Sequence, residues 1–246
     1  MEKVLWLIWQ NTDTRNKYHV GNLYCDSNGY RFEYNLEKKS RNLEAAMDDG
    51  FLPLTNFPDV NRVYQSKTLF PAFSKRLPNK RRPDYQQLLQ KFGVDHEVSD
   101  MELLQVTKGK TDMDSMELFQ PIVVDENGRF QLAFFIEGWR YYQGDDVFKE
   151  LQIDDKVLLI LEPENSFDRF AVYIETEDGV KLGYVPAVYS EFIFKHYQHL
   201  KQPKIVKKHD TAIPEMKVQV QVEGTVSRNR EKYVNMDPVR ESSLLS

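Results

Sequence analysis

The chain of 246 residues contains a single cysteine, Cys25, and five histidines. One cysteine cannot form a disulfide within the chain, and the histidines show no spacing typical of zinc ligands around it. His19 lies six residues before Cys25, but a cysteine within a β-prone run is more typical of packing than of nucleophilic catalysis. We therefore expect no metal and no cofactor, and a protein of the reducing cytoplasm.

Long hydrophobic runs are also absent. The longest apolar run near the N-terminus, Val4–Trp9, has six residues, whereas a membrane-spanning helix needs about 20. The first ten residues, MEKVLWLIWQ, also lack the small-residue cleavage site of a signal peptide. The sequence therefore predicts a soluble protein that does not enter a membrane.

Complete catalytic motifs are missing as well. Gly109-Lys110-Thr111 ends like a phosphate-binding loop, but Leu104 stands where that loop requires its first glycine. The sequence has no serine-hydrolase, zinc-protease or kinase catalytic motif. Asp112 and Asp114 could share a metal, although neighbouring acids in a turn more often cap backbone or face solvent. We therefore expect a binding protein and not an enzyme.

Charge is present but unevenly distributed. The net charge is −5, from 33 basic and 38 acidic residues. Residues 62–91 contain eight basic residues and one acidic residue, residues 101–200 contain nine basic and nineteen acidic residues, and residues 201–246 contain nine and six. Because local potential steers partners, the two basic tracts matter more than the total.

The hydrophobic pattern of residues 1–125 predicts a mixed α+β module. Strands are expected over three β-prone runs, the last two joined by an Asn-Gly turn: Val4–Trp9, Lys17–Cys25 and Tyr30–Tyr34. Helices are expected over four periodic segments, the last two with Asp84 and Asp100 as N-caps: Leu36–Asp49, Leu69–Leu77, Asp84–Phe92 and Asp100–Thr107. In the third helix a single apolar face is expected to be buried, consisting of Tyr85, Leu88, Leu89 and Phe92.

The pattern of residues 116–225 predicts short strands with small turns, which is typical of a compact β-barrel. The expected strands are Met116–Val124, Phe130–Ile136, Lys156–Leu161, Phe170–Ile174, Val180–Val185 and Met216–Val222. Two helices are expected, over Asp145–Leu151 and Ala187–Leu200. The polar end of the chain, 226–246, is expected to be a flexible tail. The predicted fold class is α+β, with domains at 1–125 and 128–225.

Three ordered blocks in the second domain resemble the HIRAN domain, a small β-barrel module. They are Gly138-Trp139-Arg140-Tyr141-Tyr142 with Gly144, then Glu162-Pro163-Glu164-Asn165-Ser166-Phe167-Asp168 before Ala171-Val172, and finally Leu182-Gly183-Tyr184-Val185-Pro186. The resemblance implies a pocket for the 3′ end of single-stranded DNA. The residues expected to bind nucleic acid are Arg140, Tyr141, Tyr142, Asn165, Phe167, Asp168, Tyr184 and Lys195.

The resemblance also implies a role for some of these side chains. Arg140 would contact phosphate, Tyr141 and Phe167 would stack on bases, and Asp168 would accept a hydrogen bond from the terminal hydroxyl. Lys195 and the lysines of 201–208 could supply the positive charge that the acidic middle of the chain lacks. The alternative is that Tyr141, Phe167 and Tyr184 only pack the core or rim of the barrel.

The first 123 residues resemble, more loosely, the N-terminal subdomain of HipA toxin kinases and the free-standing HipS-like antitoxin. The motifs are Trp9-Gln10-Asn11, Val20-Gly21-Asn22-Leu23, Arg31-Phe32-Glu33-Tyr34, Leu69-Phe70-Pro71-Ala72-Phe73, Arg76-Leu77-Pro78, Met101-Glu102-Leu103-Leu104 and Thr107-Lys108-Gly109-Lys110. This resemblance implies docking on a separate HipA-like kinase. The partner-binding residues would be Lys75, Arg76, Lys80, Arg81 and Arg82, the alternative being a solvated basic surface.

Two functions are therefore expected. In the first, the barrel binds single-stranded DNA 3′ ends and the N-terminal module docks a HipA-like kinase. In the alternative, the whole chain is an antitoxin of a toxin-antitoxin system that inhibits such a kinase, and the barrel serves packing or assembly.

Overall fold

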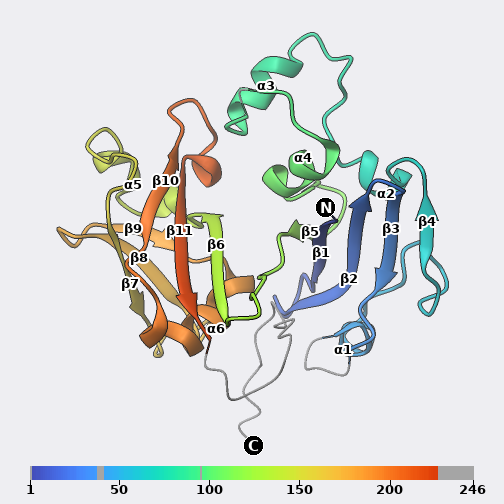
Figure 1. Ribbon diagram of the computed structural model, residues 1–246, viewed down its shortest axis with the longest axis horizontal. Coiled ribbons are helices and arrows are strands. Elements are labelled where there is room, and N and C mark those ends of the chain that lie inside the picture. The colour runs from blue at the N-terminus through green and yellow to red at the C-terminus, as the bar shows by residue number, and fades with distance from the viewer. Residues whose placement is uncertain (1, 38–41, 95, 227–246) are drawn as a thin grey trace, which may run out of the picture. The chain divides into compact units, whose positions relative to one another are not determined.

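The computed structural model describes residues 2–37, 42–94 and 96–226 (Figure 1). These residues form two compact units. The first, here called the N-unit, contains the described residues up to Gln86 together with Val94–Pro121. The second, the C-unit, contains Gln87–Gly93 and the described residues from Ile122 onward. Residues 227–246 of the predicted tail 226–246 lie outside the described residues.

The N-unit is built on an antiparallel five-stranded sheet in the order β4-β3-β2-β1-β5. Its strands are β1 (Lys3–Gln10), β2 (Lys17–Asp26), β3 (Gly29–Tyr34), β4 (Tyr64–Ser66) and β5 (Met116–Phe119). The β2–β3 hairpin has the turn that the Asn-Gly dipeptide predicts, and Asp26 caps it by accepting from the backbone N–H of Asn28 at 2.7 Å. The short β4 has no counterpart in the sequence-based prediction.

The core of the N-unit lies against this sheet and is rich in aromatic rings. Phe32 of β3 meets Phe57 at a centroid distance of 4.4 Å and Phe73 at 5.5 Å. The hydroxyl of the buried Tyr34 donates to the carbonyl of Phe57 at 2.9 Å, so the loop over 51–60 is held onto the sheet. Alternate residues of β1, such as Leu5 and Leu7, join this core. Trp6 and Ile8, which point to the other face of β1, are buried as well.

Helices α1 and α2 of the N-unit are shorter than the periodicity suggests. Helix α1 covers Leu43–Asp48, because the side chain of Asn42 accepts from the backbone N–H of Ala45 and caps the helix there. Residues 38–41 of the expected helix Leu36–Asp49 lie outside the described residues. Helix α2 covers only Pro71–Ser74, since proline occupies its first position and the following residues form tighter turns.

Helix α4 (Asp100–Thr107) has the expected length but another N-cap. Ser99 caps it, and Glu102 accepts from the backbone N–H of Ser99 at 2.9 Å in a complete capping box. In helix α3 (Tyr85–Lys91) the expected apolar face is mostly not buried. Only Leu89 is buried there, whereas the other three residues, Tyr85, Leu88 and Phe92, are partly exposed.

The C-unit contains two three-stranded antiparallel sheets, in the orders β10-β11-β6 and β7-β8-β9. The strands are β6 (Arg129–Phe135), β7 (Val157–Leu161), β8 (Val172–Thr176), β9 (Lys181–Tyr184), β10 (Lys204–Lys208) and β11 (Val218–Thr225). The expected strand Met116–Val124 ends at Phe119 and pairs with β1 of the N-unit sheet. Strand β10 was not predicted, because its lysines mask the alternation.

Isolated bridges join the two sheets of the C-unit. Glu137, after β6, pairs with Tyr184 of β9 through two backbone hydrogen bonds of 2.9 and 2.8 Å, and Lys156 bridges Lys204. The described residues thus form two small sheets that isolated bridges connect. The closed barrel expected from the sequence is not shown. The structure does show a mixed α+β fold.

Short helices complete the C-unit. Helix α6 (Ala187–His196) packs on β6, where Phe192 meets Phe130 at a centroid distance of 4.7 Å and Tyr189 meets Phe134 at 6.0 Å. The remaining helices are α5 (Gly144–Val147) and the 3-10 turns η1 (Trp139–Tyr141), η2 (Tyr197–His199) and η3 (Pro214–Met216). No helix among the described residues is long and apolar enough to cross a bilayer.

The bridge between β6 and β9 depends on a glycine. Gly183 has φ +148°, and a Cβ there would lie 2.4 Å from the carbonyl oxygen of Glu137. We expect Gly183→Ala to lower the free energy of unfolding by roughly 2 kcal/mol or more, because strain and backbone collision add together. Urea unfolding followed by tryptophan fluorescence measures the effect.

The matched control is Gly179→Ala. Gly179 also has a positive φ, +82°, but a Cβ there meets nothing within 4 Å. Strain alone should cost about 1 kcal/mol. Equal losses in both variants would contradict the structural role given to the contact with Glu137.

Candidate nucleic-acid interface

A hydrogen bond between Tyr184 and Glu162 lies at the centre of the residues that the sequence singles out. Tyr184 ends β9, and its hydroxyl donates to the Glu162 carboxylate at 2.7 Å, just after β7. Burial, together with the hydrogen bonds to Glu162 and Tyr142, raises the pKa of Tyr184 well above its ordinary value. The phenol therefore stays protonated and remains a hydrogen-bond donor at physiological pH.

Lys181 lies among three tyrosine rings beside this pair. Its ammonium is 4.3 Å from the ring centroids of Tyr173 and Tyr184 and 4.8 Å from that of Tyr142. The same ammonium donates to the Tyr184 hydroxyl at 2.7 Å and lies 3.8 Å from Glu162. Cation–π contacts and the ion pair thus orient the three rings before any ligand arrives.

The loop after β7 is organised by Asn165. Its amide donates to Glu162 at 2.5 Å, while its side-chain oxygen accepts from the backbone N–H groups of Phe167 and Asp168 at 3.0 and 3.1 Å. This Asx-type turn fixes the backbone that carries Phe167 and Asp168. The loop is therefore tied through Glu162 to Tyr184.

The η1 turn is anchored by its own tryptophan. Trp139 is buried, and its indole N–H donates to Asp145 at 2.9 Å. The Asp145 carboxylate also accepts from Lys217 at 2.5 Å, and these two donors lower its pKa against the effect of burial. Tyr142, at the other end of the turn, packs against Tyr184 with a centroid distance of 5.7 Å. Both the η1 turn and the loop after β7 are thus attached to Tyr184.

Two aromatic side chains project from these anchored segments into solvent. Tyr141 is 77% exposed and Phe167 is 93% exposed. Arg140, which precedes Tyr141 in the chain, forms an ion pair with Glu215 of η3, and its guanidinium lies 5.8 Å from the Tyr141 ring centroid. Exposed aromatic rings on a fixed backbone provide flat apolar surfaces that a planar ligand can cover.

Asp168 is placed differently from its exposed neighbour. It is only 6% exposed, and its Oδ1 accepts from the backbone N–H of Phe170 at 3.0 Å. The Phe170 ring lies 4.6 Å from the Arg169 guanidinium and 5.9 Å from the Lys195 ammonium, while Lys195 also pairs with Glu191 of α6. Positive charge therefore lies close to the loop that carries Asp168.

Comparison with known proteins decides which family this part of the chain resembles. The family model named HIRAN domain matches over 98 consecutive positions, which include all of the residues above. Residues 130–227 form a HIRAN domain. The match begins after residue 125, so the resemblance of the N-terminal module to HipA, the kinase partner and the antitoxin role stay predictions.

Two solved structures are similar to part of this chain. The crystal structure of the HIRAN domain of human HLTF has 15% sequence identity and a TM-score of 0.30, and the match covers 41% of this chain and 81% of that chain. A crystal structure of a protein from Lactobacillus plantarum has 19% identity and a TM-score of 0.32, covering 39% and 97% respectively. No curated protein matches the chain significantly.

The HIRAN domain contains functional candidates that the sequence did not single out individually. Glu162 belongs to one of the three HIRAN-like blocks but was not predicted as a site residue. Lys181 and Tyr173 belong to none of these blocks and were not predicted as site residues either. Cross-strand pairing could have suggested one of them, since Tyr173 lies opposite Tyr184 in the β8–β9 ladder. Lys181 could not be assigned because its three ring partners come from two different strands and a turn.

The lysines after the HIRAN helix α6 do not form an open basic groove. Lys201 pairs with Glu223 at 3.1 Å and Lys204 with Asp154 at 2.6 Å. Lys207 and Lys208 donate to the backbone carbonyls of Gly93 and Leu151, at 2.7 and 2.8 Å. The predicted supply of positive charge from these lysines is thus largely engaged within the C-unit.

The basic residues predicted to bind a partner differ in their exposure to solvent. Lys75, Lys80, Arg81 and Arg82 are exposed, whereas the Arg76 side chain is only 9% exposed. Arg76 donates to the carbonyl of Gly109 at 3.0 Å and forms a bidentate pair with Asp114. These contacts give Arg76 a structural role.

Among the described residues, no group of three or more histidine, cysteine and acidic side chains is placed to hold a metal ion.

The Glu162 network makes acid stability testable. Burial would raise the pKa of Glu162, but hydrogen bonds from Asn165 and Tyr184 and the charge of Lys181 outweigh it and hold the pKa below the ordinary value of 4.5. A lowered folded-state pKa stabilises the fold above the unfolded-state pKa, and this stability is lost as the pH falls through the folded-state value. Glu162→Gln should remove that part of the acid-induced loss.

Urea unfolding at neutral pH and at several acidic pH values measures this difference. Glu164→Gln is the control, since Glu164 is exposed two residues away, and it should keep the wild-type dependence. The idea is wrong if both variants lose stability in acid as steeply as the wild type does.

Proposed function

We propose that the HIRAN domain of this chain binds the 3′ end of single-stranded DNA as a non-catalytic module. Membership of residues 130–227 in the HIRAN family supports a nucleic-acid-binding role in general. The side chains around Tyr184 support the more specific assignment.

One observation carries the proposal. The Tyr184–Glu162 pair anchors both segments that bear exposed aromatic rings, through Tyr142 to Tyr141 on one side and through Asn165 to Phe167 on the other. Because the backbone that carries the two rings is already fixed, little backbone freedom is lost when a base stacks on them. Because every base has a π-face, such stacking tolerates any sequence and contributes about 1 to 3 kcal/mol per base.

Charge and burial favour a strand end over a continuous strand. The nearly buried Asp168 carboxylate accepts hydrogen bonds and repels phosphate, so a terminal hydroxyl is a better neighbour for it than an internal phosphodiester. Arg140 is exposed and can exchange its ion pair with Glu215 for the first phosphate. A 3′-terminal nucleotide presents the base, the hydroxyl and the phosphate that these groups would recognise.

The stacking role predicts the effect of removing one ring. Phe167→Ala should weaken binding of a 3′-hydroxyl oligothymidylate roughly 5- to 150-fold, which corresponds to about 1 to 3 kcal/mol. The change should leave folding intact, because Phe167 is almost fully exposed. Fluorescence anisotropy measures the affinity. Ile153→Ala, another exposed apolar residue of the C-unit, is the control and should bind like the wild type.

The role of Asp168 predicts a change in end preference. The wild type should bind an oligonucleotide with a free 3′ hydroxyl more tightly than the same oligonucleotide with a 3′ phosphate. Asp168→Asn keeps an oxygen that can accept from the backbone N–H of Phe170 but removes the negative charge, so the preference should shrink. Equal wild-type affinity for the two oligonucleotides would rule out recognition of the 3′ end.

A further inference from the structure

A continuous stretch of the N-unit is strongly basic. Residues 62–82 contain seven basic side chains and no acidic one. The stretch runs from just before β4 through α2 and into the approach to α3. Its cations fall into two groups, according to whether a carboxylate neutralises them.

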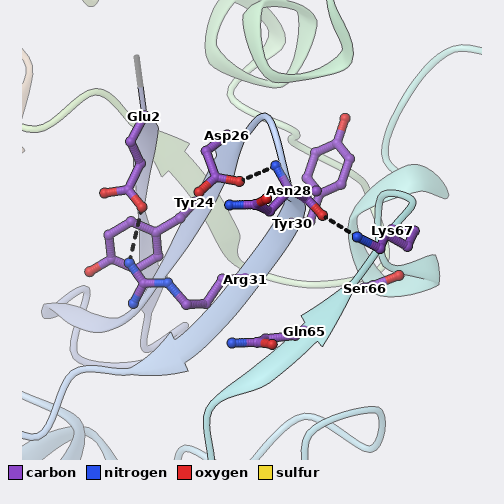
Figure 2. A pocket seen from close by; sticks show the side chains of 10 residues that line it. Glu2, Tyr24, Asp26, Asn28, Tyr30, Arg31, Gln65, Ser66 and Lys67 are labelled. Atoms are coloured by element: carbon purple, nitrogen blue, oxygen red, sulfur yellow. Dashed lines mark hydrogen bonds and ion pairs between the residues drawn. The ribbon is translucent and has the colours of Figure 1, made fainter.

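Three of the seven are already paired. Arg76 pairs with Asp114, Lys80 with Asp100 at 3.0 Å, and Arg82 with Asp84 at 2.8 Å. An ion pair of this kind presents little net charge to a partner. Arg31, at the neighbouring cavity of about 470 Å³, is likewise engaged by Glu2, as Figure 2 shows.

The other four basic residues are exposed and are called the four cations below. They are Arg62, Lys67, Lys75 and Arg81. In the described part of the chain, none of the four has a carboxylate within ion-pair distance. Arg62 lies over the Tyr64 ring at 5.3 Å, and Lys67 donates to the backbone carbonyl of Asn28 at 3.3 Å (Figure 2). Their positive charge is therefore available to an external anion.

The chain keeps two of these cations within reach of each other. Lys67 follows β4 directly, and Lys75 follows α2 directly. The intervening residues, one helical turn included, can separate their Cα atoms by at most about 20 Å. A flexible polyanion of several units can span that distance.

The surroundings of the four cations favour a nucleic-acid backbone over a protein. The centre of a protein interface is apolar and aromatic. Among the described residues of this stretch, Val63 is the single large apolar side chain that is exposed, so an apolar centre is missing there. Repeated phosphates, in contrast, need only dispersed cations.

We propose that the four cations form a second nucleic-acid contact, which binds the phosphate backbone of single-stranded DNA without reading its sequence. The inference rests on the proposed function of the HIRAN domain. It also accounts for a physical difficulty, because residues 101–200, which include most of that domain, contain nineteen acidic and only nine basic residues. End recognition and backbone attraction are thus assigned to different units of the same chain.

Salt dependence tests the second contact. The variant Arg62→Gln/Lys67→Gln/Lys75→Gln/Arg81→Gln is compared with the wild type on a long 3′-hydroxyl oligothymidylate over a series of KCl concentrations. A plot of log K against log salt has a negative slope, and each lost phosphate contact makes that slope shallower by about 0.7. We expect a loss of roughly 2 to 3 in slope, with the ratio of affinities for 3′-hydroxyl and 3′-phosphate ends unchanged.

The matched control removes four paired cations of the same unit: Lys3→Gln/Lys80→Gln/Arg82→Gln/Lys110→Gln. It changes net charge equally, so equal slope losses in both variants would overturn the inference in favour of a general charge effect. Thermal unfolding midpoints check that both variants fold. Equal competition by polyglutamate would also overturn it, because the surface would then accept any polyanion.

The two proposals fail separately in this design. An unchanged slope in the first variant, with 3′-end preference intact, contradicts the second contact alone. If the variant loses salt dependence but the wild type binds 3′-hydroxyl and 3′-phosphate ends equally well, end recognition alone is contradicted. A wild type that binds neither oligonucleotide contradicts both.

Discussion

The hydrogen bond from Tyr184 to Glu162 is the contact on which the candidate site depends. It joins the end of β9 to the loop after β7, and it brings the η1 turn in through the Tyr142 ring. Lys181 compensates for the cost of placing a carboxylate among tyrosines, since its ammonium faces three rings and the same acid. This pair adds a side-chain link between the two segments that carry exposed aromatic rings, beside the backbone bridge between Glu137 and Tyr184.

The two proposed nucleic-acid contacts fall on parts of the chain that differ in charge. The HIRAN domain is acidic, which suits a site that distinguishes a terminal hydroxyl from phosphate but weakens long-range attraction to DNA. The N-unit carries exposed cations that no described carboxylate neutralises. A global charge of −5 conceals this division.

Prediction from sequence succeeded where local chemistry decides. The β2–β3 hairpin followed from its Asn-Gly turn, and α4 followed from its apolar period. It failed where one side chain competes with another: Ser99 and not Asp100 caps α4, because only Ser99 can exchange hydrogen bonds with Glu102. Strand β4 was missed because three residues carry too little pattern to stand out, and its pairing with β3 comes from the fold.

The sequence by itself determined the HIRAN motifs, the positions of Tyr141, Phe167 and Asp168 along the chain, and the uneven charge. These features depend on residue type and spacing, which are visible in one dimension. Only the tertiary structure decided that Glu162 and Lys181 hold the site together and that Arg76 is engaged with Asp114. Ion pairs and ring contacts form between residues far apart in the chain, so the availability of a charge or a ring is known only once its neighbours are in place.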